Sequence, residues 1–284
     1  PHLMMQYNIS PEMLVEPVDY TDEMRQILSQ GVSVDRMLTK QINLSQLNGV
    51  TMTPNGQFFR TEKQGFLPKM LEDQYESRKK FKKMMLAAKQ EYENEKDESK
   101  KYEIKKRIAR YDNLQLAKKV SLNSAYGAMG SQYFRFYDLR QALAVTTAGQ
   151  LSIRWIERKL NEYLNKLLKT EKDYVIASDT DSIYLNLGPL VTQVYGTNGK
   201  VSMPKQKVIE FMDRVCEDKI QPYIDSSYNE LANYVHAFSQ KMQMKREGLS
   251  DKGIWTAKKR YILNVYTESN GSRNGEVINS IGNP

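Results

Sequence analysis

Charged residues alternate with good helix formers from about Lys69 to Gly127, and this pattern predicts two helices folded back on each other. The first extends to about Tyr92. The polar run 93–99 supplies the tip, and the second helix extends from about 101 through 123. A hairpin of this kind is expected to project from the rest of the fold.

Longer amphipathic patterns follow in the second half of the chain. A helix is predicted from Tyr137 to Leu168, where apolar residues recur at intervals of four, three and four and so form a stripe on one face. The members of this stripe are Ile156, Leu160, Tyr163 and Leu167. Another helix is predicted from Lys205 to about Phe238.

Short apolar runs bounded by polar residues predict the strands. A Pro-Asn-Gly turn followed by strand formers predicts a hairpin at 53–59. Further strands are expected at 174–177, 183–185, 242–246 and 259–265, with a loop at Gly188-Pro189. The sequence therefore predicts an α+β fold, in which a small antiparallel sheet carries packed helices and the two-helix hairpin projects from it.

Composition narrows the class of partner. The net charge of +8 favours a polyanion, most simply nucleic acid, although a generally basic protein would have the same charge. Hydrophobic residues make up 40% of the chain, enough for a packed core, and no stretch approaches the length of a membrane span. The single cysteine, Cys216, excludes an internal disulfide and fits a reducing compartment such as the cytoplasm.

Two carboxylates lie two residues apart, at Asp179 and Asp181, in the predicted turn between two strands. Like charges held this close are unfavourable unless a cation lies beside them, which indicates a magnesium site for phosphoryl chemistry. Aspartate is also common at hairpin turns for conformational reasons alone, and that alternative explains the pair without a metal.

Basic residues cluster on both helices of the hairpin. Residues 78–83 contain five cations, and Arg78 and Lys82 share a helix face. This arrangement fits a site for a triphosphate, and it equally fits a lysine-rich helix surface exposed to solvent. On the second helix Lys119, Asn123 and Tyr126 fall within a narrow arc, followed by Gly127. A cation, an amide and an aromatic ring on one face can bind a nucleotide. The alternative is a purely structural role, in which Tyr126 is buried and Gly127 caps the C-terminus of the helix.

Near the end of the chain, Lys258, Lys259, Arg260 and Tyr261 fall on a predicted strand. Alternation would direct Lys259 and Tyr261 to one face and Lys258 and Arg260 to the other, so that one face could hold a phosphate backbone. A charged edge strand that prevents aggregation is the alternative.

The three motifs, in this order, resemble those of the family B DNA polymerases. The amino-acid sequence is most similar to that of the T-even-like phage branch of the family. Residues 119–127 resemble the fingers motif Lys-x-x-x-Asn-Ser-x-Tyr-Gly, and 179–182 the palm motif Asp-Thr-Asp-Ser. Residues 258–261 resemble the Lys-Lys-x-Tyr motif that holds the primer–template duplex. The resemblance covers nearly the whole chain.

The resemblance implies a mechanism. A primer 3′-hydroxyl attacks the α-phosphate of an incoming deoxynucleoside triphosphate, assisted by two Mg²⁺ ions. Asp181 is the expected principal metal ligand, with Asp179 beside it and Glu247 as a further carboxylate near the metals. The resemblance assigns the triphosphate to Arg78, Lys82 and Lys119, the nascent base pair to Asn123 and Tyr126, and the duplex to Gly127 and residues 258–261.

The resemblance also implies a division of the chain. Residues 1–68 would be the N-terminal part of a palm, 69–129 the fingers hairpin and 130–284 the remaining palm. Residues 1–12 resemble the stretch directly after the family's first metal-binding motif, so the exonuclease region, that motif and the thumb are expected to lie outside this chain. An upstream polymerase polypeptide would then be a partner besides primer–template DNA.

Two other hypotheses stay open. The chain could be a catalytically dead remnant that binds DNA, with an affinity that falls steeply with salt. It could also be an RNA-synthesising polymerase, although Asp-Thr-Asp and Lys-x-x-x-Asn-Ser-x-Tyr-Gly fit DNA polymerases better. The resemblance to phage sequences predicts that the protein acts in the cytoplasm of a host cell and has no membrane partner.

Overall fold

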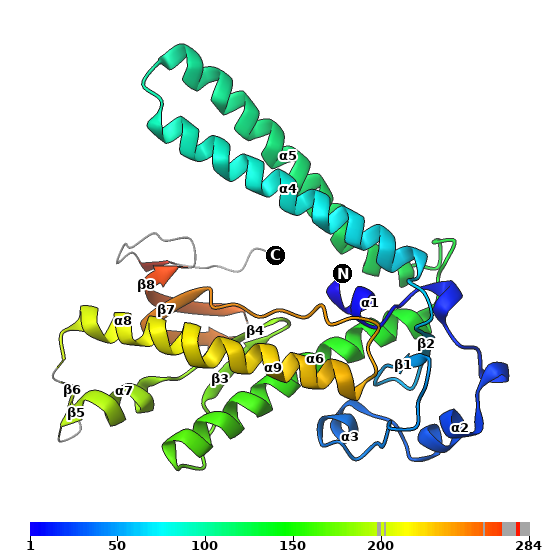
Figure 1. Ribbon diagram of the computed structural model, residues 1–284. Coiled ribbons are helices and arrows are strands. Elements are labelled where there is room, and N and C mark those ends of the chain that lie inside the picture. Colours follow the sequence, from blue (N-terminus) through cyan, green and yellow to red (C-terminus); the bar gives the residue numbers. More distant parts are fainter. Residues whose placement is uncertain (198–199, 202, 258, 269–276, 279–284) are drawn as a thin grey trace. The chain divides into compact units, whose positions relative to one another are not determined.

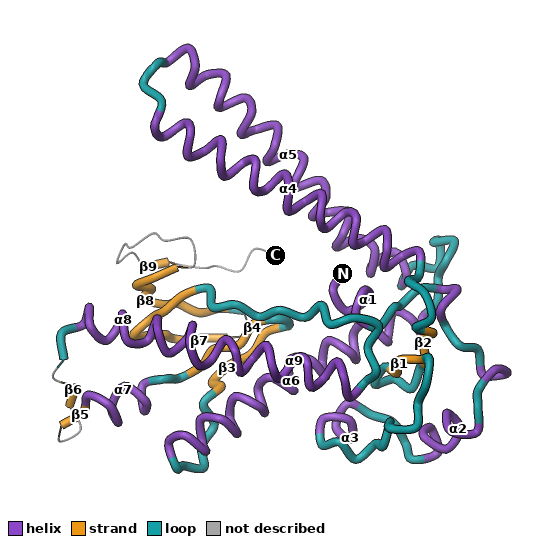
Figure 2. The backbone as a smooth tube through the Cα atoms, in the orientation of Figure 1, coloured by secondary structure: helices purple, strands orange, loops and turns teal. Residues whose placement is uncertain are grey.

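The protein's structure is a computed structural model that describes residues 1–284 except 198–199, 202, 258, 269–276 and 279–284. It is an α+β fold, as predicted, with long helices and small antiparallel sheets (Figure 2). The chain forms two compact units. Unit 1 comprises Pro1–Leu151 and Ala232–Met242, and unit 2 comprises Ser152–Leu231 and Gln243–Pro284.

The first part of unit 1 is built from short elements around a dense core. These are α1 (His2–Gln6), the 3₁₀ turns η1 (Pro11–Met13) and η2 (Pro17–Asp19), α2 (Asp22–Ser29), α3 (Val34–Leu38), β1 (Val50–Met52) and β2 (Phe58–Arg60). Strands β1 and β2 pair antiparallel and confirm the predicted hairpin, whose turn contains Gly56 at φ +77°. The fully buried core side chains include Met4, Tyr7, Ile9, Met37, Phe58 and Phe59.

The predicted two-helix hairpin is present in unit 1. Helix α4 (Phe66–Asn94) and helix α5 (Glu98–Met129) pack antiparallel side by side (Figure 1). Both extend beyond the predicted bounds, because Pro68 is accommodated in the first turn of α4 and Gly127 lies inside α5. The C-cap of α5 is Gly130, so the alternative that made Gly127 a C-terminal glycine is wrong.

Helix α6 (Leu139–Leu168) follows, and it contributes its first part to unit 1 and its second part to unit 2. The predicted apolar stripe holds for Ile156 and Leu160, which are fully buried, whereas Leu167 is 47% exposed. Instead Leu164 is buried, together with Leu168, against Tyr174 and Leu190. The buried face therefore lies slightly rotated from the one that spacing alone predicted.

Unit 2 continues with β3 (Val175–Asp179), β4 (Ser182–Leu185), α7 (Gly188–Tyr195), β5 (Gly196–Thr197), β6 (Lys200–Val201) and α8 (Lys205–Val215). A π-helical turn, η3 (Cys216–Ile220), leads into α9 (Gln221–Tyr234). Strands β7 (Gly248–Ala257), β8 (Arg260–Glu268) and β9 (Val277–Ile278) form one antiparallel sheet. None of the helices in the described part of the chain is long and apolar enough to cross a membrane.

Three local predictions in the second half of the chain are wrong. Gly188-Pro189 opens helix α7 rather than a loop, since proline fits the first turn of a helix. Residues 242–246 are irregular rather than a strand, and side chains hold their backbone, as in the bond from Gln221 Nε2 to the Met244 carbonyl at 2.8 Å. The helix predicted to end near Phe238 ends at Tyr234.

Candidate active site

The acidic turn lies between β3 and β4, as predicted. Asp179 is the last residue of β3 and pairs with Ser182, so Thr180 and Asp181 form a two-residue loop. The Asp181 N–H donates to the Asp179 carbonyl at 2.6 Å, and the Ser182 hydroxyl donates to the same carbonyl at 3.2 Å. This loop presents an exposed Asp181 beside a half-buried Asp179.

The backbone of this turn is strained. Thr180 has φ +54°, a left-handed conformation that a β-branched residue rarely adopts. Its hydroxyl donates to Asp179 Oδ1 at 2.9 Å, which ties the threonine to the neighbouring carboxylate. Strain of this kind persists only where the surrounding structure over-determines it, and it is concentrated at functional sites.

An aromatic group lies beside the acidic turn. The Tyr184 ring on β4 makes edge contacts with Trp255, at 5.2 Å between centroids, and with Tyr261, at 5.1 Å. Burial raises the pKa of the Tyr184 phenol, and the hydrogen bond with Tyr261 and the charges of Asp179 and Glu247 raise it further. Within unit 2, Tyr184 therefore contacts Tyr261, and the negative charges of Asp179 and Glu247 act on its phenol.

Asp181 acts electrostatically on a different tyrosine. Tyr228 on α9 is 3% exposed, and its pKa is raised by burial and by the negative charge of Asp181. Sequence reasoning singled out neither Tyr184 nor Tyr228. Tyr184 could have been found from the sequence, because it lies two residues after Ser182 on a strand and so shares a face with it. No pattern in the sequence of α9 pointed to Tyr228.

The donor set of the turn fits magnesium chemically. Mg²⁺ prefers oxygen ligands, keeps several waters and is commonly held by one or two carboxylates together with substrate phosphates. Asp179 and Asp181 supply two such carboxylates. Among the described residues, no group of three or more His, Cys, Asp or Glu could hold a metal ion. Glu247 precedes β7 directly and lies in an irregular segment.

The basic residues of the hairpin lie in unit 1. On α4, Arg78 is half-buried and its Nε has no hydrogen-bond partner among the described residues, whereas Lys82 is exposed one turn further on. On α5, Lys119 and Asn123 are exposed and Tyr126 is 39% exposed. The exposure of Tyr126 rules out the alternative of a buried tyrosine.

The two sets of cations lie at a similar level of the hairpin. The ion pair between Arg107 Nη2 and Glu91 Oε1, at 2.6 Å, gives the register of the antiparallel helices. Arg78 lies 13 residues before Glu91, and Lys119 lies 12 residues after Arg107. Because both helices rise by about 1.5 Å per residue, Arg78 and Lys119 are level with each other.

The C-terminal basic motif is not a continuous strand. Trp255 pairs with Tyr261 and Ala257 with Arg260, so the motif surrounds the turn between β7 and β8. Lys259 lies in that turn at φ +63°, and Lys258 lies outside the described residues. The predicted alternation of Lys259 with Arg260 is therefore wrong, because a left-handed residue ends the strand. Arg260 is exposed and Tyr261 is half-buried beside Tyr184.

The structure thus gathers the candidate residues in two sets. Within unit 1 it brings together Arg78, Lys82, Lys119, Asn123, Tyr126 and Gly127 on one helical hairpin. Within unit 2, Tyr261 contacts Tyr184, the charges of Asp179 and Glu247 act on Tyr184, and Asp181 lies in the turn that follows Asp179.

Comparison with known proteins identifies the family. Residues 1–197 match the sequence model of DNA polymerase family B, and the chain belongs to this family. Over 54% of its own length, the present chain is 43% identical to the DNA-directed DNA polymerase of Enterobacteria phage T4. It is 30% identical to the DNA-directed DNA polymerase of Escherichia phage RB69 over 97% of its length, and 29% identical to the DNA polymerase beta of African swine fever virus (strain Badajoz 1971 Vero-adapted) over 78%.

These relatives are much longer than the matched region. The alignments cover 18% of the T4 polymerase, 34% of the RB69 polymerase and 17% of the African swine fever virus polymerase. The chain therefore spans about a third or less of the relatives that it matches.

Proposed function

We propose that this chain is the fingers-and-palm portion of a DNA-directed DNA polymerase, which transfers deoxynucleotides to a primer 3′-hydroxyl on a DNA template. Residues 69–129 are the fingers, and residues 1–68 and 130–284 belong to the palm. Family membership over residues 1–197 supports the class of reaction. The observation that carries the site assignment is the strained β3–β4 turn with its two carboxylates.

In this proposal Asp179 and Asp181 hold Mg²⁺ at the turn. Two ions, when bound, would stabilise charge on the attacking and leaving oxygens of the phosphoryl transfer. Asp181 is the principal ligand because it is the more exposed of the two. Glu247 supplies a negative charge that acts on Tyr184, but among the described residues it does not form a three-carboxylate metal site with the two aspartates. Two aspartates do not complete a two-ion site, so a further acidic ligand comes from polymerase sequence outside these 284 residues, in the same or a separate polypeptide.

The hairpin binds the triphosphate of the incoming deoxynucleotide. Arg78, Lys82 and Lys119 neutralise its charge, and the similar level of Arg78 and Lys119 lets one ligand contact both helices. The exposed Asn123 and Tyr126 border the nascent base pair, where an amide and an aromatic ring test its shape. Gly127 gives the DNA close access to α5, since among the described residues no atom beyond its own stretch of helix lies within 4 Å of the position a Cβ would take.

The duplex is held by the turn between β7 and β8. Lys258, Lys259 and Arg260 contact the phosphate backbone, and Tyr261 contacts the primer terminus from its place beside Tyr184. The phage relatives favour the cytoplasm of an infected host as the place of action.

Primer extension with Mg²⁺ and all four deoxynucleotides tests the proposal. The chain is assayed alone and with a polypeptide that supplies the upstream motif, in wild-type form, as Asp181→Ala and as Asp218→Ala. Asp218 is an exposed carboxylate in the π-helical turn and serves as the matched control.

Extension by the wild type and Asp218→Ala but not by Asp181→Ala supports the assignment. Extension by Asp181→Ala overturns it. DNA binding without extension under every condition, with an affinity that falls steeply with salt, identifies a DNA-binding remnant instead.

A further inference from the structure

The start of α4 and the residues that follow α5 both form hydrogen bonds with one short segment of unit 1, residues 8–16. The segment lies about fifty residues before the hairpin in sequence. Its side chains reach the start of α4 on one side and the residues that follow α5 on the other. None of these residues belongs to the motifs that assign the nucleotide, the metal or the duplex.

Residues 10 and 12 cap the start of α4. The first N–H groups of a helix lack partners within the helix, and the residue at the N-cap is Gly65, which has no side chain to supply one. Glu12 Oε1 accepts the Phe66 N–H at 2.6 Å, and Ser10 Oγ accepts the Leu67 N–H at 3.3 Å. The Ser10 hydroxyl also donates to Glu12 Oε2 at 2.6 Å, which orients the glutamate.

Asn8 fixes the approach to the same helix. Its Oδ1 accepts the Gly65 N–H at 2.8 Å, and its Nδ2 donates to the carbonyls of Arg60 and Lys63, each at 2.8 Å. The side chain is fully buried, and the backbone adopts φ +53°, a conformation that asparagine tolerates better than most residues. Asn8 thus holds three points of the chain that leads into α4.

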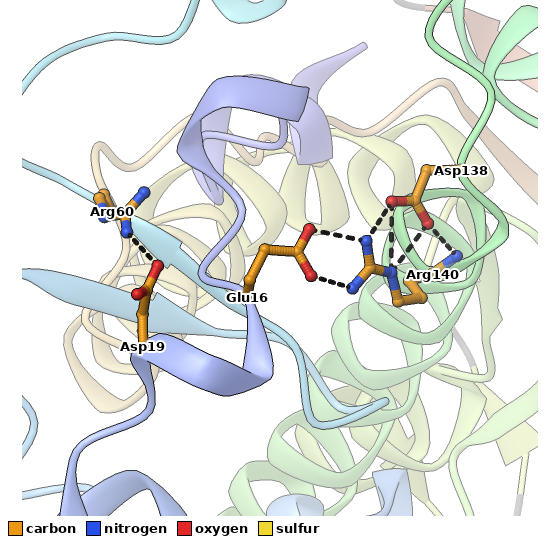
Figure 3. A network of polar contacts seen from close by, with 5 residues as sticks. All are labelled: Glu16, Asp19, Arg60, Asp138 and Arg140. Atoms are coloured by element: carbon orange, nitrogen blue, oxygen red, sulfur yellow. Dashed lines mark hydrogen bonds and ion pairs between the residues drawn. The ribbon is translucent and has the colours of Figure 1, made fainter.

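Glu16 ties the other end of the hairpin. Arg140, in the first turn of α6, donates to Glu16 through Nη1 at 2.7 Å and through Nη2 at 2.9 Å (Figure 3). The same guanidinium donates to Asp138 Oδ2 through Nη2 at 2.8 Å, and the Asp138 N–H donates to the Met129 carbonyl at the end of α5. A bidentate Arg–carboxylate pair has a defined geometry, so this contact orients as well as attracts.

We propose that residues 8–16 form a strap that positions the hairpin for triphosphate binding, with Asn8, Ser10, Glu12 and Glu16 as positioning residues. This inference rests on the proposed function of Arg78, Lys82 and Lys119. Arg78 lies 12 residues after the capped Phe66 on one continuous helix, so the orientation of the first turn is transmitted to the cation. Releasing either end of the hairpin separates cations that must meet one ligand together.

The test compares two caps within unit 1 of the 284-residue chain. Glu12→Ala removes the cap of α4, and Glu12→Gln keeps an oxygen acceptor. The matched control is Thr21→Ala, because Thr21 caps α2 by accepting the Met24 N–H at 3.3 Å and α2 carries none of the triphosphate residues. Binding of inorganic triphosphate with Mg²⁺ is measured by calorimetry, and exchange of the Phe66 and Leu67 amides is followed by hydrogen–deuterium exchange.

Glu12→Ala is expected to weaken triphosphate binding about fivefold, which corresponds to the loss of one helix cap, and to speed exchange at Phe66 and Leu67. Glu12→Gln is expected to restore both, and Thr21→Ala to change neither. Equal affinity in wild type and Glu12→Ala, or equal weakening by Thr21→Ala, overturns the strap. Failure of the proposed function has a different signature, which is absence of triphosphate binding by the wild type itself.

Discussion

Gly65 and Ser10 approach each other so closely that a Cβ added to Gly65 would lie 2.6 Å from the Ser10 Cβ. Gly65 has φ −66°, so the requirement for glycine comes from the space around it and not from its backbone conformation. The contact joins the N-cap of α4 to a fully buried serine more than fifty residues earlier. The base of the hairpin is therefore specified by a long-range contact.

Gly65→Ala is expected to destabilise the chain by about 1–3 kcal/mol, because the added methyl overpacks a site whose nearest neighbours are held by the core.

Gly127→Ala is the matched variant, since Gly127 lies inside α5 and, among the described residues beyond its own stretch of helix, nothing lies within 4 Å of the added Cβ. It is expected to stabilise the helix by about 0.5–1 kcal/mol while weakening DNA binding. Urea denaturation and a salt-matched DNA titration measure the two effects. Unchanged DNA affinity of Gly127→Ala would contradict the role proposed for this glycine.

Thr180→Asn is expected to stabilise unit 2 by about 1 kcal/mol, because asparagine adopts the left-handed region at a lower cost than a β-branched residue. Thermal unfolding measures the change. If the strain serves the metal site, primer extension should fall while stability rises. Thr256→Asn, in the exposed part of β7, is the control and should give no gain in stability.

The two tryptophans should respond differently to replacement by phenylalanine. Trp155 on α6 is 2% exposed and its indole N–H donates to the Ser227 carbonyl at 3.0 Å, so Trp155→Phe leaves a buried carbonyl without that donor and a small cavity. A loss of about 2–3 kcal/mol is expected. The buried Trp255 Nε1 has no hydrogen-bond partner in the part of the chain that the structure describes, and Trp255→Phe should cost about 1 kcal/mol or less. Equal losses in urea unfolding would contradict the role of the Ser227 bond.

Glu72 on α4 makes the stability of unit 1 depend on pH. Hydrogen bonds from Lys241 Nζ, at 2.6 Å, and from Gln64 Nε2, at 2.8 Å, lower the pKa of the Glu72 carboxyl from its ordinary value of 4.5. The unfolded chain therefore takes up the proton first as the pH falls. The stabilisation is complete well above pH 4.5 and is lost as the pH falls through the lower pKa of the folded state.

Glu72→Gln should remove this dependence. The pair is about one-third exposed, so the difference between wild type and variant is expected to be below about 1 kcal/mol near neutral pH and to vanish in acid. Denaturant unfolding at a series of pH values measures it. Glu62→Gln, which replaces an exposed carboxyl in the same unit, is the control and should leave the free energy of unfolding near neutral pH unchanged.

Cys216 should react slowly in the folded chain. Burial raises the pKa of its thiol to about 11 from an ordinary value of 9. At pH 8 the thiolate fraction, and with it the rate of alkylation by iodoacetamide, should fall about a hundredfold. Unfolding in urea should restore the ordinary rate. Because Cys216 is the only cysteine of the chain, mass spectrometry follows the reaction without ambiguity. Fast labelling of the folded chain would show that the π-helical turn opens.

Local patterns in the sequence were enough to predict the elements that depend on local forces. The period of charged and apolar residues predicted α4 and α5, and the two apolar runs around Asp179 and Asp181 predicted the β3–β4 hairpin. The same local reasoning failed at residues 242–246 and at Lys259. There the chain conformation depends on long-range side-chain bonds or on a single left-handed residue, and neither changes the hydrophobic period.

The sequence by itself determined the periodic elements, the acidic turn and the order of the polymerase motifs, because each is encoded in residues near one another along the chain. Only the tertiary structure decided how the start of α4 is capped and which groups surround Tyr184. The N–H groups of Phe66 and Leu67 are paired with side chains more than fifty residues earlier, and Tyr184 meets Trp255 and Tyr261 about seventy residues later. Such contacts form because a folded chain must satisfy buried polar groups and cover apolar surface with whatever lies close in space.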